Sequence, residues 1–166
     1  MIQEKLVISD TNILLDLISV DMLEDFFSLP CDFSTTDFVI SEIIQPAQIK
    51  AIEKYTKLKK LDIVSFSFEE IIEITDIHSK NTSNASITDC SVWYYARKTG
   101  GRLLTGDGKL RKSAEGDNVK VSGILYIFDN LVEYEILEKD KYQVVLLKDK
   151  QICIFCCCRQ DHKHMC

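Results

Sequence analysis

The sequence of 166 residues lacks any long apolar run. No stretch approaches the roughly 20 consecutive apolar residues that a membrane-spanning helix needs. Residues 1–5 are followed by only three apolar residues in a row, which excludes a typical secretory signal peptide. We therefore expect a protein without a membrane segment.

Cysteine is scarce over most of the chain. Only Cys31 and Cys90 occur in the first 150 residues, which is typical of free thiols in a reducing compartment. This pattern predicts a cytoplasmic location. The net charge of −6 argues against binding of polyanions through the overall field, although a local basic patch or a metal-neutralised acidic cluster remains compatible with it.

Two common catalytic patterns are also missing, a glycine-rich phosphate-binding loop and a Ser/His/Asp arrangement. What the sequence does contain is an alternation of short apolar segments with segments of helical periodicity. Strands are expected at 6–9, 31–35, 63–66, 103–105 and 119–121, and helices at 13–18, 37–45, 48–60, 68–79, 87–99, 109–114 and 125–134, with one further element at 142–147. This order predicts one α/β domain whose parallel sheet is covered on both faces.

Four carboxylates occupy positions where such a fold binds ligands, beyond the carboxyl ends of its strands. Asp10 ends the first strand and Asp107 follows the strand that ends at Thr105. Glu42 and Asp89 are expected in the first turns of helices that follow crossovers. If the four converge, they form an all-oxygen site of the kind that Mg²⁺ or Mn²⁺ prefers.

Each of these acids also has a purely structural interpretation. Asp89 follows Ser86 at capping-box spacing, Asp107 lies between two glycines and suits a turn or a helix cap, and Glu42 suits an exposed helix face. Asp10 is the hardest to explain structurally, because a carboxylate directly after a buried strand needs partners.

Taken together, four segments resemble the PIN-domain ribonucleases, a family that includes the toxins of VapBC-type toxin–antitoxin modules. The resemblance covers about residues 5–135, and the segments are VISDTNILLDL, TTDFVISEI, SITDCSVWYYARKTGGRLLTGDGKLRK and VKVSGILYIFDNLVE. It implies a three-layer α/β/α sandwich around a parallel sheet. The chain then divides into a single nuclease domain at 1–150 and an atypical tail at 151–166.

The resemblance also implies roles for individual residues. The family's catalytic, metal-binding acids match Asp10, Glu42, Asp89 and Asp107, with Glu42 in the most variable region. Polar positions beside the metal match Asn12 and Thr105, and Thr11 with Asn12 would orient Asp10 or the attacking water. The implied activity is divalent-metal-dependent hydrolysis of RNA that leaves 5′-phosphate and 3′-hydroxyl ends.

A group of basic residues surrounds the third and fourth acids and could hold RNA phosphates without reading bases. These residues are Arg97, Lys98, Arg102, Lys109, Arg111 and Lys112. Some of them equally suit the last turn of a helix, which favours cations in any protein. Trp93, Tyr94 and Tyr95 have the helical spacing of core and dimer-interface residues, which we favour over base stacking.

Family resemblance implies a homodimer and, for a toxin, a small antitoxin that covers the acidic cleft. Two other functions were weighed. A non-catalytic RNA- or protein-binding module could use the same scaffold, although mutually repelling acids would then have no purpose. A haloacid-dehalogenase-type phosphatase would need a second acid at the position that Asn12 occupies.

The segment from Gln151 to Cys166 differs abruptly in composition and holds five of the seven cysteines. Its C-x-x-C and histidines are zinc-type ligands, but their spacing is not that of a usual structural site. Lipidation of the cysteine run is a second interpretation. We favour a third, a shifted reading frame or a dispensable end.

Overall fold

The computed structural model describes residues 4–8 and 11–138. Asp10, the element expected at 142–147 and the cysteine-rich tail lie outside these residues. The elements follow one another as β1 (Glu4–Ile8), α1 (Thr11–Ser19), α2 (Leu23–Phe26), β2 (Cys31–Thr36), α3 (Asp37–Ser41), α4 (Pro46–Lys57), β3 (Leu61–Val64), α5 (Phe68–Lys80), α6 (Ile87–Thr99), β4 (Arg102–Leu104), α7 (Gly108–Gly116), β5 (Val121–Ser122) and α8 (Ile124–Glu133).

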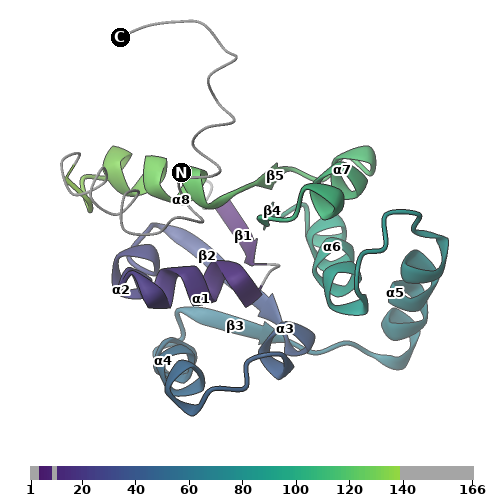
Figure 1. Cartoon of the computed structure of the whole chain (residues 1–166), viewed down its shortest axis with the longest axis horizontal. Coiled ribbons are helices and arrows are strands. Elements are labelled where there is room, and N and C mark those ends of the chain that lie inside the picture. The colour runs from purple at the N-terminus through teal and green to yellow at the C-terminus, as the bar shows by residue number, and fades with distance from the viewer. Residues whose placement is uncertain (1–3, 9–10, 139–166) are drawn as a thin grey trace, which may run out of the picture.

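The five strands form one parallel sheet in the order β3-β2-β1-β4-β5. Figure 1 shows helices around this sheet, with α6 between the strands and the outlying helix α5. Helix α6 contacts β1, β2 and β4, whereas α1 contacts α2 and α4, and α2 contacts α8. The expected α/β class and the three-layer PIN-like sandwich are confirmed.

The core lies between the sheet and its helices, and strand residues supply its centre. Leu103 and Leu104 of β4 have no exposed surface, and Phe33 of β2 packs its ring against Phe26 and Phe27. A second, smaller apolar cluster joins α5 to α6 through Ile74 and Tyr94. The predicted core role is confirmed for Trp93 and Tyr94, which are buried, whereas Tyr95 is only partly buried.

Helix α6 has the bounds that the sequence predicted because both of its ends carry strong local signals. Ser86 and Asp89 form a capping box at the start, in which each side chain bonds the other's backbone N–H. Gly100 ends the helix with a φ of 68°, a left-handed conformation that glycine adopts without steric cost. These signals fix the position of Asp89 in the first turn.

Several predicted bounds differ from the structure, and one short helix was not predicted. Helix α4 begins at Pro46 rather than at residue 48, since proline is well tolerated at the first helical position. Strand β3 begins at Leu61 rather than at residue 63, and Leu61 is almost fully buried and pairs with Phe33. The short helix α2 was not predicted, because four residues give too little periodicity.

Within the described ranges, no helix combines the length and the apolar character that crossing a bilayer requires. Cys31 and Cys90 are free thiols.

Candidate acidic site at the carboxyl edge of the sheet

The order of the strands indicates where a fold of this kind would bind a ligand, at the carboxyl ends of β1 and β4. From β1 the chain proceeds outward to β2 and β3, and β4 and β5 then lie on the other side of β1. A reversal of strand order of this kind opens a crevice between the diverging connections. Thr11 begins the helix after β1, and Asp107 follows β4 by three residues.

Thr11 and Glu42 are brought together at this edge from positions 31 residues apart. The Thr11 hydroxyl donates a hydrogen bond of 2.6 Å to Oε2 of Glu42. Thr11 is buried, while Glu42 is exposed and lies at the C-cap of α3. The prediction that Glu42 lies in a first helical turn is therefore wrong, because α3 has only five residues and ends before it.

Asp89 lies in the first turn of α6, as predicted, and its structural role is also present. Its Oδ2 accepts hydrogen bonds from the backbone N–H and the hydroxyl of Ser86, both at 2.9 Å. Its own N–H donates to Ser86 Oγ at 3.0 Å. A carboxylate offers about four acceptor positions over two oxygens. The capping box therefore orients the Asp89 carboxylate at the start of α6.

Asp107 is held at the start of α7 in a similar way. Its Oδ1 accepts the N–H of Lys109 at 2.7 Å, so that it caps the helix as the turn sequence allowed. The Asp107 N–H donates to the hydroxyl of Thr105 at 2.9 Å, and Thr105 has no exposed surface. Thr105 thus holds the turn that presents Asp107.

A buried pair of hydroxyls joins the segments that carry Glu42 and Asp89. Thr36 Oγ1 and Ser91 Oγ are 2.9 Å apart, and neither residue is exposed. Ser91 donates its only hydroxyl hydrogen to the Thr88 carbonyl at 2.7 Å. Thr36 must therefore be the donor to Ser91, while its oxygen accepts the N–H of Val39 at 3.4 Å and caps α3. This pair was not predicted from the sequence, because its only local signal is the capping position of Thr36.

Comparison with known proteins identifies the family. A profile described as PIN domain (DUF3368) matches residues 6–155. The chain belongs to the PIN-domain family. Members of this family are generally nucleases that use divalent metals, so the match supports a PIN-type nuclease at the family level. No curated protein gave a significant match.

Among solved structures, PAE2754 from Pyrobaculum aerophilum resembles this PIN domain, with a TM-score of 0.55 and 15% identity over 80% of this chain and 98% of that chain. At this identity the likeness supports the fold alone. FitAcB from Neisseria gonorrhoeae was also found, with a TM-score of 0.43 and 10% identity over 72% of this chain and 98% of that chain.

The donor chemistry of this edge suits a hard divalent cation. Glu42, Asp89 and Asp107 offer carboxylate oxygens from three different connections, and carboxylates are the ligands that Mg²⁺ and Mn²⁺ favour. Within residues 4–8 and 11–138, no group of three acidic, histidine or cysteine side chains is close enough to hold a metal. The fourth acid of the predicted set, Asp10, lies outside these ranges.

Cys90, next to Asp89, is not a reactive group of this edge. Burial raises the pKa of its thiol to about 11, and the negative charge of Asp89 acts in the same direction. A thiol with this pKa is protonated at neutral pH and is therefore a poor nucleophile and metal ligand.

The predicted RNA-binding residues of the PIN domain fall into two groups. Four of them already have partners in the structure. Arg97 forms an ion pair with Asp117, and Lys98 forms one with Glu70. Arg102 donates a hydrogen bond to Ser122 and lies over the Tyr126 ring, and Arg111 donates hydrogen bonds to the carbonyls of Thr105 and Val121. Lys109 and Lys112 are exposed at the start and middle of α7, beside Asp107. Within the described part of the chain, no ion pair involves either lysine.

Proposed function

We propose that this PIN domain is a divalent-metal-dependent endoribonuclease that hydrolyses RNA phosphodiester bonds. The observation that carries the proposal is the Thr11–Glu42 hydrogen bond, which holds a carboxylate at the residue that begins the helix after β1. Asp107 and Asp89 are anchored by their own helix starts on the adjoining connections. Membership of a nuclease family makes catalysis the natural use of such an arrangement.

Asp10, Glu42, Asp89 and Asp107 would hold Mg²⁺ or Mn²⁺. When bound, such an ion neutralises charge on the phosphoryl oxygens and lowers the pKa of a water molecule. The protein's own contribution is to orient the carboxylates. Thr11 holds Glu42, Thr105 holds the backbone of Asp107, and the Ser86 cap holds Asp89. Asn12, which is exposed at the start of α1, would position the attacking water.

Lys109 and Lys112 are the side chains best suited to contact RNA phosphates, because they are exposed on the helix that Asp107 caps. Arg97, Lys98, Arg102 and Arg111 would contribute to the field around the site or exchange their present partners for phosphate. Such contacts would position RNA without selecting a base sequence. The products would carry 5′-phosphate and 3′-hydroxyl ends.

We further infer, from the resemblance to VapBC-type toxins, a homodimer and a small antitoxin whose segment covers the acidic edge. A short open reading frame beside the gene would support the antitoxin. Sedimentation of the purified protein would test the dimer.

The activity is tested with end-labelled RNA of mixed sequence in Mg²⁺ or Mn²⁺, with EDTA as the metal-free control. Asp107→Asn and Glu42→Gln should each lose cleavage. Glu133→Gln, which removes an exposed charge from α8, should retain it. Loss in all three variants would indicate a general folding effect, and cleavage retained by both site variants would contradict the proposal. If the wild type cleaves none of the RNAs with or without metal, a non-catalytic binding module becomes the better description.

A further inference from the structure

Helix α5 exposes an unusual amount of apolar surface for a helix of a folded domain. Phe68, Ile71 and Ile72 have 73%, 40% and 54% of their surface exposed. Of the 13 residues of α5, only Ile74 is buried. Phe68 and Ile72 are four residues apart and therefore lie on one side of the helix. Contiguous apolar surface of this kind marks an interaction site more often than a solvated face.

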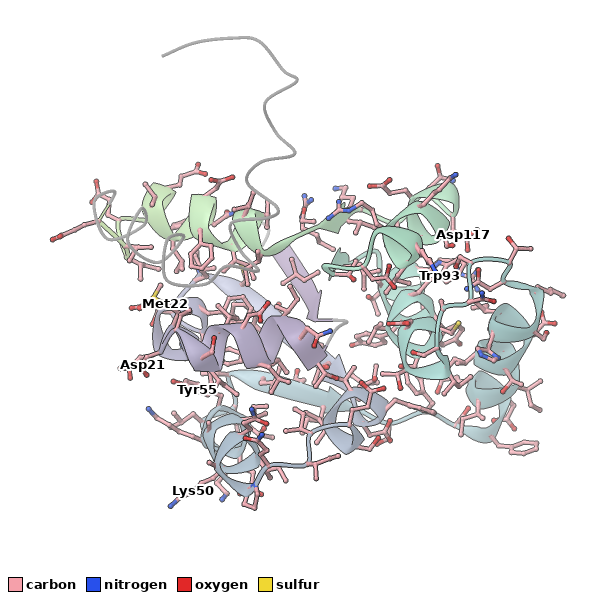
Figure 2. The ribbon with its side chains drawn as sticks, viewed as in Figure 1. Asp21, Met22, Lys50, Tyr55, Trp93 and Asp117 are labelled. Atoms are coloured by element: carbon pink, nitrogen blue, oxygen red, sulfur yellow. The ribbon has the colours of Figure 1, made fainter. Side chains whose placement is uncertain are left out.

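A cavity of about 510 Å³ continues this apolar surface toward α6 and α7. Ile72 and Ile77 of α5 and Trp93 of α6 supply its apolar lining. Its polar lining comes from Glu73, Asp76, Lys80, Asn81, Arg97 and Asp117. Figure 2 shows Trp93 and Asp117 where α6 faces α5 and α7. None of the four acids of the proposed metal site lines the cavity, although Arg97, one of the predicted RNA-binding residues, does. The two features therefore form a separate surface, which we call the α5 groove: Phe68, Ile71, Ile72, Ile77 and Trp93.

The α5 groove contains a hydrogen-bond donor that lacks an acceptor. Trp93 is only 7% exposed, and its indole N–H has no hydrogen-bond partner among the described residues. Buried indole N–H groups usually find an acceptor. The nitrogen itself is buried, so a chain bound in the cavity would contact the Trp93 ring rather than this N–H.

The charges around the groove indicate which partner fits it. Helix α5 carries Glu69, Glu70, Glu73 and Asp76 but only one lysine, Lys80. The cations that line the cavity are already neutralised, Lys80 by Asp76 at 2.7 Å and Arg97 by Asp117 at 2.9 Å. In the described part of the chain, Glu69 and Glu73 pair with no lysine or arginine. The apolar residues of the α5 groove are therefore bordered by charged side chains, and among these the carboxylates of Glu69 and Glu73 are not neutralised by a described lysine or arginine.

We propose that the α5 groove binds a cationic amphipathic helix of another protein. Leucine-type side chains of that helix would cover Phe68 and Ile72 and enter the cavity over Trp93, as in helix-in-groove recognition. Its lysines or arginines would face Glu69 and Glu73. A second copy of this chain fits less well, because pairing α5 with its own copy would place two sets of acids against each other.

Trp93 is the only tryptophan of the chain, so its fluorescence reports directly on this surface. The probe is a tryptophan-free Leu/Lys peptide of about 18 residues with leucines at helical i, i+3, i+4, i+7 spacing, long enough to form a stable helix when bound. A shuffled peptide of the same composition and a Leu/Glu peptide serve as controls. The expected result is a saturable change in Trp93 emission with the Leu/Lys peptide alone.

Matched variants locate the binding site. Phe68→Ser/Ile72→Ser should weaken binding at least tenfold, and Glu69→Gln should weaken it less and reduce its dependence on salt. Leu58→Ser removes an equally exposed apolar side chain elsewhere, at the C-cap of α4, and should bind as the wild type does. The readout needs no nuclease activity, so its outcome is independent of the proposed function.

Equal responses to the shuffled peptide, no response to the Leu/Lys peptide, or unchanged binding by the double variant would each overturn the proposal. Sedimentation without peptide adds a further test. A homodimer that Phe68→Ser/Ile72→Ser dissociates would assign the groove to self-association instead.

Discussion

Thr11 donates a 2.6 Å hydrogen bond to Glu42, and this contact joins the first residue of α1 to the residue that ends α3. Glu42 is otherwise an exposed carboxylate whose side chain would sample many positions. The bond holds one of its oxygens at the start of the helix that follows β1. Thr11 thereby orients an exposed acid that we propose as a metal ligand.

Thr11→Val should lower RNA cleavage or Mn²⁺ affinity by about 10- to 100-fold, the usual cost of losing a group that orients a metal ligand. Thr11→Ser keeps the hydroxyl and should stay close to the wild type. Single-turnover cleavage at several Mn²⁺ concentrations measures both quantities. Equal activity of the valine and serine variants would show that Glu42 needs no orientation from Thr11.

The two roles of Asp89 can be separated through its capping partner. Ser86→Ala removes the hydroxyl of the capping box and should destabilise the protein by about 1 kcal/mol, measured by urea unfolding, with most of the cleavage retained. Asp89→Asn keeps side-chain acceptor capacity at this position and should lose cleavage with a smaller loss of stability. If activity instead follows stability in both variants, Asp89 acts only as a cap.

The Thr36–Ser91 pair should be visible as a coupling energy. Thr36→Val leaves Ser91 without its donor and should cost about 1–3 kcal/mol of unfolding free energy, as for other buried groups that lose a partner. In a double-mutant cycle with Ser91→Ala, the two losses should be less than additive. Additive losses would mean that the two hydroxyls do not interact in solution.

The Glu70–Lys98 bridge predicts a measurable titration shift. The Lys98 hydrogen bond of 2.6 Å, with further help from Ser67, lowers the pKa of Glu70 below its ordinary value of 4.5. A carboxyl whose pKa is depressed on folding stabilises the protein above its unfolded pKa, and this contribution is lost as the pH falls through the folded value. Carboxyl NMR should place the Glu70 midpoint below 4.5, and Lys98→Met should move it upward. A midpoint unchanged by Lys98→Met would place the cause elsewhere.

The class of the fold could be predicted because its signals are local. Apolar strands, the Ser86 cap and Gly100 each depend on a few neighbouring residues, and α6 was accordingly predicted with its observed bounds. The start of strand β3 was predicted two residues too late, because Leu61 belongs to the strand through its pairing with Phe33 and not through a pattern among its neighbours. Strand pairing of this kind is a long-range effect that periodicity does not report.

Long-range contacts also limited what could be predicted about the acidic site. Strand ends predicted which edge would carry the acids, since parallel strands present their carboxyl ends together. The partners of these acids were harder to predict, because Thr11 with Glu42 and Thr36 with Ser91 are separated by 31 and 55 residues. Likewise, no local pattern indicated that Lys98, one of the six predicted RNA-binding residues, pairs with Glu70 on another helix.

The central claim is that the acids of this edge form one cation site, and metal-dependent thermal stability tests it without requiring a known RNA substrate. Melting temperatures should be compared with and without Mn²⁺ for the wild type, Asp10→Asn, Asp107→Asn and the control Glu133→Gln. An ion that binds only the folded protein stabilises it by about 2.7 kcal/mol at 100 times its dissociation constant. We predict that Mn²⁺ raises the melting temperature of the wild type and of Glu133→Gln but of neither site variant. The proposed cation site would be contradicted if Mn²⁺ raised the melting temperature of none of these proteins and the site variants melted at or above the wild-type temperature.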